Sequence, residues 1–184
     1  MALDLGSGAG GFTRRLQGMT GMDFVGVDYV VEAAQMAASF SRAGIIGYLA
    51  ADSLALPFRE KTFDLVSDRG CLHHIEGRKR RERYLREVHR VLRPGGNLLL
   101  VGMGERTPRR WWDRIASALF VNVSPFGSLE IERLSQGRFE HLGRKDHLAW
   151  MPLSHRFFPL RIPVNFQVHR LSARSAIGRG GGSC

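Results

Sequence analysis

This chain of 184 residues has few cysteines and no long apolar run. Its two cysteines, Cys71 and Cys184, are too few for a disulfide framework, so we expect a reducing, cytoplasmic setting. No stretch approaches the roughly 18 apolar residues that a membrane-spanning helix needs. The first residues include Asp4 instead of the basic lead and apolar segment of a secretory signal. These absences exclude secreted disulfide scaffolds and membrane-spanning proteins from the prediction.

Lysine is also scarce: the chain has 27 lysines and arginines, and lysine occurs only at Lys61, Lys79 and Lys145. The formal net charge of +10 would suit an anionic partner such as RNA. A skewed base composition of the genome also explains such an excess of arginine. Because no basic motif is interleaved with aromatic residues, we interpret the charge as compositional and keep RNA as the alternative partner. The spacing of cysteine and histidine matches no common zinc site, so no metal is predicted.

Strand-like and helix-like segments alternate along the first 103 residues. We predict strands over residues 1–5, 24–28, 45–52, 63–70 and 97–103. We predict helices over residues 11–20, 32–44 and 78–92, the last followed by the stop signal RPGG. This alternation indicates a parallel sheet covered on both faces.

The second half of the chain is less regular. We predict helices over residues 107–120 and 128–135 and a strand over residues 164–171. Residues 150–163 read as an apolar loop that, with Trp111 and Trp112, covers the acceptor. The predicted organisation is one domain over residues 1–172, with a cofactor-binding half (1–103), an acceptor-side half (104–172) and a disordered tail (173–184).

The glycine-rich loop LGSGAGGF follows the first predicted strand and fits two fingerprints. Gly6, Gly8 and Gly11 match the G-x-G-x-x-G of dinucleotide-binding enzymes. Gly6, Gly8 and Gly10 match a tighter G-x-G-x-G, which is typical of proteins that hold S-adenosylmethionine. Both need glycine because the backbone turns tightly and approaches a ligand without a side chain in the way. The glycines alone leave the cofactor open.

Three aspartates near the ends of the first three predicted strands separate the two fingerprints. Asp4 lies in a strand buried on both faces, where a carboxylate is costly unless it has partners. An anion beneath the loop gains nothing at a pyrophosphate site, but it suits the ammonium and sulfonium groups of S-adenosylmethionine. Asp28 can accept both ribose hydroxyls of either cofactor, and we expect Asp52 to reach an adenine amino group. The carboxylates therefore favour S-adenosylmethionine over a nicotinamide dehydrogenase.

Five motifs in a fixed order resemble those of the class I S-adenosylmethionine-dependent methyltransferases. They are LDLGSGAG, VGVD, AADSLALPF, FDLVSDRGCLHHI and REVHRVLRPGGNLLLV, and they cover residues 1 to about 103. The resemblance implies a doubly wound, mostly parallel, seven-stranded Rossmann-like sheet, with residues 164–171 as the antiparallel strand typical of the family. It also implies S-adenosylmethionine as the cofactor and methyl transfer as the reaction.

The resemblance also implies roles for individual residues. The residues implied to bind the cofactor are Asp4, Gly6, Ser7, Gly8 and Gly10 at the methionine part, Asp28 and Tyr29 at the ribose and adenine, Asp52 and Ser53 at the adenine edge, and Asp68 near the methionyl group. Each has an ordinary alternative, since glycines at strand–helix turns are often geometric and aspartates often cap helices.

Two histidines, His73 and His74, follow the fourth predicted strand, where an open α/β sheet places its reactive centre. We interpret them as catalytic residues that orient or deprotonate the methyl acceptor; alternatively, one caps the next helix and the other packs against the sheet. Cys71 reads as a small buried residue. The chain lacks the Asn/Asp-Pro-Pro-aromatic tetrad and the Pro-Cys nucleophile of two nucleic-acid methylating groups in the family. The prediction is therefore a small-molecule acceptor, with RNA as the alternative.

Met1 stands only three residues before Asp4, so the lead-in helices that family members carry before the first strand are missing. We expect a truncated reading frame, a fragment or an alternative start. A non-catalytic remnant that still binds the cofactor is accordingly a third interpretation.

Overall fold

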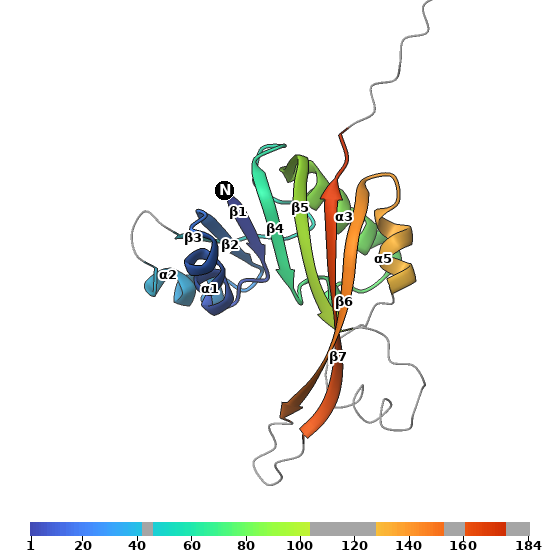
Figure 1. Ribbon diagram of the computed structural model, residues 1–184. Coiled ribbons are helices and arrows are strands. Elements are labelled where there is room, and N and C mark those ends of the chain that lie inside the picture. The colour runs from blue at the N-terminus through green and yellow to red at the C-terminus, as the bar shows by residue number, and fades with distance from the viewer. Residues whose placement is uncertain (42–45, 104–127, 153–160, 176–184) are drawn as a thin grey trace, which may run out of the picture.

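The computed structural model describes residues 1–41, 46–103, 128–152 and 161–175 (Figure 1). Seven strands form one sheet in the order β3-β2-β1-β4-β5-β7-β6. The strands are β1 (Ala2–Leu5), β2 (Phe24–Asp28), β3 (Ile46–Ala50), β4 (Phe63–Arg69), β5 (Leu92–Met103), β6 (Phe139–Pro152) and β7 (Arg161–Ala173). The helices are α1 (Gly11–Thr20), α2 (Val31–Ser39), the short 3₁₀ turn η1 (Leu72–His74), α3 (Arg78–Val91) and α5 (Ser128–Ser135). The predicted mostly parallel, seven-stranded sheet is confirmed.

Strand β1 pairs in parallel with β2 on one side and with β4 on the other. All four of its residues are buried, as expected for a strand covered on both faces. The register sets Leu5 opposite Val27 of β2 and opposite Asp68 of β4. The three strands therefore end at the same edge of the sheet, and the segments that follow them meet there.

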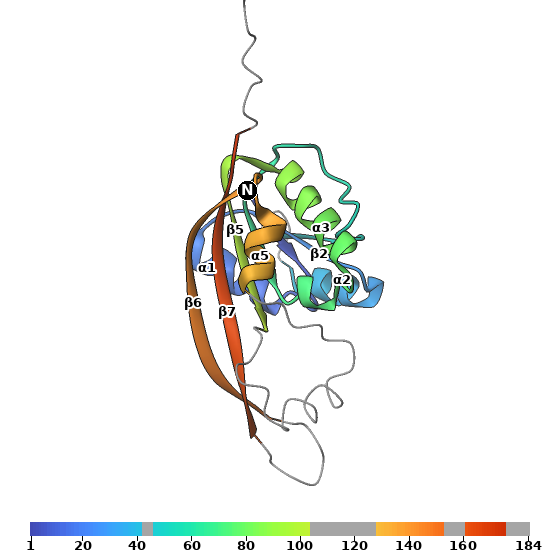
Figure 2. The same ribbon diagram turned by 90° about the vertical axis from the view of Figure 1, so that its right-hand side faces the viewer.

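The helices cover both faces of the sheet (Figure 2). Helices α3 and α5 lie side by side on one face, and α1 lies on the other (Figures 1 and 2). The apolar stripe predicted for α3 is confirmed, because Tyr84, Leu85 and Val88 are completely buried. Together with the strands they form the hydrophobic core.

Two predicted helix ends were wrong. Helix α2 ends at Ser39, whereas the prediction ran to Gly44, and residues 42–45 lie outside the described part. Leu92 is not the last residue of α3 but the first of β5, opposite Phe63. Gly95, with φ at 78°, takes the left-handed turn that the RPGG stretch needs between this pair and the regular ladder.

The predicted strand over residues 164–171 is confirmed as part of β7, which pairs antiparallel with β5. Strand β6 was missed. Its residues 140–147 are all exposed and mostly polar, so no buried stripe marks them; β6 is an edge strand, defined by its pairing with β7. The loop predicted over residues 150–163 was wrong at both ends, since Trp150–Pro152 and Arg161–Pro163 belong to this hairpin.

Several predictions fall on residues outside the described part: the helix over residues 107–120 with Trp111 and Trp112, the centre of the loop at 153–160, and residues 176–184 of the predicted tail. The tail predicted from residue 173 begins too early, because Ala173 is a buried residue of β7 that pairs with Phe139. The helix predicted over residues 128–135 is confirmed as α5. Within the described ranges, no helix has the length and apolar character needed to cross a membrane.

Candidate functional site

A cavity of about 410 Å³ opens at the sheet edge where β1, β2 and β4 end. Its lining comes from four segments that are far apart in the sequence. They include Gly6 after β1, Asp28 and Tyr29 at the end of β2, Ser53 after β3, and Arg69, Gly70, Cys71, His73 and His74 at and after the end of β4. A cavity of this size can enclose a small organic ligand. This is the position in which open α/β sheets bind their ligands.

The glycine loop turns over the carbonyl of Val27, which accepts the backbone N–H groups of both Gly6 and Ser7. Gly8 has φ at +52°, and no atom lies within 4 Å of the position that a Cβ would occupy. Its own N–H donates to Asp28 Oδ2 over 2.7 Å. The backbone at Gly8 therefore faces open space, as a ligand cradle requires.

At Gly10, in contrast, the absence of a side chain leaves room for the ring of Tyr48. A Cβ at Gly10 would collide with the hydroxyl of Tyr48, which donates to the Gly10 carbonyl over 3.2 Å. Gly10 also precedes α1 with φ at 75°. Its role is to seat Tyr48 and turn the chain into α1, so the space above it is not available to a ligand.

Asp28 and Tyr29 lie together at the rim of the cavity. Each carboxylate oxygen of Asp28 accepts one backbone N–H, from Gly8 and from Val30 (2.9 Å). A carboxylate has about four lone-pair positions, so lone pairs of Asp28 are left for hydroxyl donors. Tyr29 is 79% exposed, with its ring free to cover a flat ligand group.

The structure does not bring Asp4 to the cavity. Its carboxylate is 2% exposed and accepts the hydroxyls of Thr13 on α1 and Ser67 on β4, both over 2.6 Å. Burial raises the pKa of Asp4 from its ordinary value, against the effect of these two hydrogen bonds. Asp4 joins β1 to α1 and β4.

Asp68 is also engaged within the protein. It is completely buried, and its Oδ1 accepts the N–H groups of Gly70 and Cys71 while its Oδ2 accepts the Leu72 N–H and the Tyr84 hydroxyl. Burial raises the pKa of Asp68 to about 6, against these four donors. Asp68 lies under the η1 turn and holds it, with its lone pairs directed to the protein.

Asp52 and Ser53 follow β3 at the other side of the cavity. Asp52 is exposed and does not line the cavity; its Oδ1 accepts the Leu54 N–H over 2.8 Å. Ser53 does line it, and its hydroxyl accepts the thiol of Cys71 at 3.6 Å. Burial raises the pKa of Cys71 far above its ordinary value, so this thiol stays protonated, as expected for a small packed residue.

His73 and His74 both line the cavity, with ring centroids 4.4 Å apart. His74 is exposed, whereas His73 packs against Gly70, and its Nδ1 is buried with no hydrogen-bond partner among the described residues. Burial, followed by the neighbouring charges of His74 and Arg81, lowers the pKa of His73 to about 4. His73 is therefore neutral at pH 7.

Sequence reasoning missed three residues of this region. Arg69 lines the cavity with its guanidinium 4.6 Å from the ring centroid of Phe12, Tyr84 holds Asp68, and Tyr48 packs on the glycine loop. Of the three, only Arg69 could have been predicted from the sequence, because it follows Asp68 directly at the end of a predicted strand. The two tyrosines reach the site from α3 and β3 through the tertiary fold.

Among the described residues, no group of three or more histidine, cysteine, aspartate or glutamate side chains is placed to hold a metal ion. Ser7 is buried, and its hydroxyl has no hydrogen-bond partner within the same part of the chain. Ser7 does not line the cavity, and its Oγ lies beside Gly26 of β2, 3.0 Å from the position that a Cβ would occupy there.

Comparisons with known proteins agree with this geometry. Residues 3–100 match the methyltransferase-domain family. The human protein named "Probable tRNA methyltransferase 9B" is 33% identical over 134 residues, which cover 67% of this chain and 28% of that protein. Norajmaline N-methyltransferase of Rauvolfia serpentina is 29% identical over 108 residues, which cover 56% of this chain and 36% of that enzyme. This chain therefore spans well under half the length of both relatives.

A solved structure from Methanosarcina mazei, described as a SAM-dependent methyltransferase, has the same fold with a TM-score of 0.74 at 20% identity. The likeness covers 95% of this chain and 92% of that one. The family match runs from β1 to β5 and includes every segment that lines the cavity. The chain belongs to the methyltransferase-domain family, the class I S-adenosylmethionine-dependent methyltransferases.

Proposed function

We propose that this chain binds S-adenosylmethionine in the cavity at the ends of β1, β2 and β4 and transfers its methyl group to a small-molecule acceptor. The observation that carries the proposal is that one cavity is lined both by the glycine loop with Asp28 and by the two histidines after β4. A cofactor and an acceptor held in one cavity can be aligned for displacement.

The cofactor part of the proposal assigns binding to the residues that face open space. Asp28 receives the ribose hydroxyls with its remaining lone pairs, and the exposed ring of Tyr29 covers the adenine. Asp52 and Ser53 face the adenine edge, and Gly8 lets the methionine part approach the backbone. These assignments follow the carboxylates and glycines on which the sequence prediction rested.

The remaining predicted residues shape the site through contacts within the protein and do not bind the cofactor directly. Asp4 and Asp68 hold the walls of the site, because their oxygens are engaged by hydroxyl and N–H donors of the protein. Gly6 and Gly10 shape the loop, and the buried hydroxyl of Ser7 lies against Gly26 of β2.

Bound S-adenosylmethionine supplies a methyl carbon attached to a sulfonium leaving group. The neutral ring of His73 can accept a hydrogen bond from an O–H or N–H of the acceptor, and His74 lies beside it. Because a group with a pKa near 4 is a weak base at pH 7, His73 orients the acceptor and contributes little to removing its proton. Alignment then provides most of the acceleration.

Two substitutions test the role of the histidines. In His73→Ala and His74→Ala, we expect turnover to fall about 10- to 100-fold, while the affinity for S-adenosylhomocysteine, measured by calorimetry, stays nearly constant. The control is His147→Ala, an exposed histidine on β6 that does not line the cavity. Turnover that is unchanged in both variants removes the histidines from the reaction.

The acceptor class is tested by incubating the chain with methyl-labelled S-adenosylmethionine and a fractionated cell extract. Label in the low-molecular-weight fraction supports the proposal, and label in RNA overturns it in favour of the alternative. Cofactor binding without transfer to any fraction indicates a chain that binds the cofactor and lacks turnover.

RNA is the second candidate acceptor because a relative is named as a tRNA methyltransferase and α3 carries a basic surface. The exposed basic residues of α3 are Arg78, Lys79, Arg80, Arg83 and Arg86. Retention on RNA that weakens steeply with salt favours this candidate. Retention that is equal for wild type and a variant with Arg78, Lys79 and Arg80 changed to Gln argues against a specific surface.

A further inference from the structure

The segment over residues 51–62 connects β3 to β4 and forms one wall of the cavity. Ala51 and Ser53 line the cavity, and Asp52 lies between them. Leu54 and Leu56 anchor the segment in the core with 7% and 5% exposure. The segment belongs to no ladder of the sheet, so its backbone groups need partners from elsewhere.

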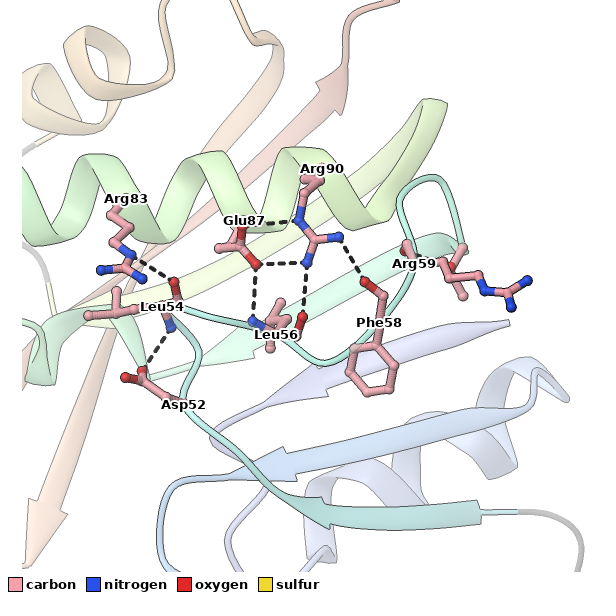
Figure 3. Close-up of polar contacts among 9 residues, drawn as sticks. Asp52, Leu54, Leu56, Phe58, Arg59, Arg83, Glu87 and Arg90 are labelled. Carbon is pink, nitrogen blue, oxygen red and sulfur yellow. Dashed lines mark hydrogen bonds and ion pairs between the residues drawn. The ribbon is translucent and has the colours of Figure 1, made fainter.

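Backbone carbonyls accept the N–H groups of Ala51, Lys61 and Thr62 at the two ends of the segment. Side chains of α3 bind its central part (Figure 3). Arg90 donates from Nη1 to the Phe58 carbonyl over 2.7 Å and from Nη2 to the Leu56 carbonyl over 2.9 Å. Glu87 accepts the Leu56 N–H over 3.0 Å. Figure 3 shows these bonds in a row along one side of the helix, each reaching the backbone of the segment below.

Glu87 and Arg90 also bind each other. Arg90 Nε donates to Glu87 Oε1 over 3.0 Å, and Arg90 Nη2 donates to Glu87 Oε2 over 2.8 Å. This two-point contact holds both planar groups in one orientation, so the donors and acceptors that face the segment are fixed in advance. The same contact lowers the pKa of Glu87, which keeps the carboxylate charged.

The contacts continue to Leu54 and Asp52, which flank Ser53 in the cavity wall. Arg83 Nε donates to the Leu54 carbonyl over 2.9 Å, while the Leu54 N–H donates to Asp52 Oδ1 over 2.8 Å. The row from Arg90 to Arg83 thus holds the backbone up to the residue whose N–H fixes the Asp52 carboxylate (Figure 3). The side of the segment toward α3 is bound by charged groups, and the side toward the cavity is left for a ligand.

We propose that Glu87 and Arg90 are positioning residues that set how the site recognises the adenine edge, by fixing the segment that carries Asp52 and Ser53. The inference rests on the proposed cofactor site. Neither residue touches the cavity, so both act through the backbone of residues 54–58. A displacement of the segment weakens discrimination between nucleoside bases before it weakens contacts at the ribose, because Asp28 belongs to a different strand.

The first test needs no ligand. Glu87→Gln and Arg90→Ala are compared with Glu82→Gln, a matched change on the same helix, where Glu82 pairs with Arg78 at the surface. We expect hydrogen exchange at the Leu54 and Leu56 amides to rise about tenfold or more in the first two variants and to stay at the wild-type rate in Glu82→Gln. Unchanged exchange in Glu87→Gln and Arg90→Ala overturns the inference.

The second test measures base discrimination by calorimetry with S-adenosylhomocysteine and its inosine counterpart, in which an oxygen replaces the adenine amino group. The wild-type protein should prefer the adenine compound by about tenfold, the worth of one hydrogen bond. Arg90→Ala should reduce this preference to about twofold, Arg90→Lys should restore part of it, and Glu82→Gln should keep it.

The outcomes separate the two proposals. Wild-type protein that binds neither compound overturns the proposed function and this inference with it. Binding with an unchanged preference in Arg90→Ala overturns this inference alone. A general loss of stability would weaken both compounds equally and would appear in the melting temperature, so an unequal loss at a constant melting temperature supports a positioning role.

Discussion

Near the ends of β2 and β4, the two neighbours of β1, the chain places two aspartates in different environments. Asp68 is in register with Leu5, and Asp28 lies one position beyond Val27, the other partner of Leu5. Asp28 is partly exposed, accepts one backbone N–H on each oxygen, and lines the cavity. Asp68 is completely buried and accepts four donors, three of them backbone N–H groups of residues 70–72 and one the Tyr84 hydroxyl. The first carboxylate has capacity left for a ligand, and the second has its capacity used by the protein.

The comparison shows that a carboxylate at a strand end is informative only together with its donors. Both aspartates follow an apolar strand, and both fit the family motifs. The difference lies in the Tyr84 hydroxyl and in the backbone N–H groups of residues 70–72, which surround Asp68 with donors. The reach of a strand-end carboxylate to a ligand therefore depends on how many protein donors already bind it.

The largest expected effect is the loss of stability in Asp68→Ala. The substitution leaves several buried donors without a partner, so the free energy of unfolding should fall by about 3 kcal/mol or more. Asp28→Ala, with donors close to solvent, should lose no more than about 1 kcal/mol. Denaturant unfolding at pH 7 measures both, and equal stability of the two variants would contradict the comparison.

The second prediction concerns ligand affinity, for which Asp28 should matter more than Asp68. Asp28→Ala should weaken binding of S-adenosylhomocysteine about 30- to 100-fold, which corresponds to two lost hydrogen bonds to a carboxylate. Calorimetry measures the dissociation constant, and Asp28→Asn serves as the partly conservative control. An unchanged affinity in Asp28→Ala would place the ribose elsewhere.

The pH dependence of the stability lost in Tyr84→Phe tests whether the Tyr84 hydroxyl stabilises the charged form of Asp68. The Tyr84 hydroxyl lowers the pKa of Asp68 and so favours its charged form, although burial still leaves that pKa at about 6. Its stabilising effect is therefore largest well above pH 6 and decreases as the pH falls to about 6. We expect Tyr84→Phe to cost about 1–2 kcal/mol at pH 8 and less at pH 5. An equal loss in the free energy of unfolding at both pH values would show that the hydroxyl does not favour the charged form of Asp68.

Tyr29 should give the smallest effect. Only the exposed ring face is expected to meet the adenine, so Tyr29→Ala should weaken S-adenosylhomocysteine about five- to tenfold. Tyr29→Phe should leave the affinity unchanged, because the ring remains. A loss in Tyr29→Phe equal to that in Tyr29→Ala would show that the hydroxyl, and not the ring, makes the contact.

The part of the site that could be predicted lies near the glycine loop and β2. There Asp28 and Tyr29 line the cavity and a Cβ at Gly8 would meet open space, and all three residues are adjacent in sequence to apolar strands, so a local pattern locates them. The same reasoning assigned Asp4 and Asp68 to the ligand, whereas their oxygens bind Thr13, Ser67 and Tyr84. Sequence position gives the strand on which a carboxylate lies, but the direction of its hydrogen bonds depends on donors from other elements.

The sequence by itself determined the parallel core from β1 to β5 and the place of the cofactor loop, because apolar runs and glycine turns act through local conformation and burial. Only the tertiary structure decided which aspartates face the cavity, how α3 holds the segment over residues 51–62, and that β6 pairs with β7. Strand β6 directly precedes β7 among the described strands, but its exposed polar residues give no buried stripe. Tyr84 is 16 residues from Asp68, and Arg90 is 32 residues from Phe58, so these partners meet only when the chain folds. Hydrogen bonds across such distances leave no periodic mark on the chain.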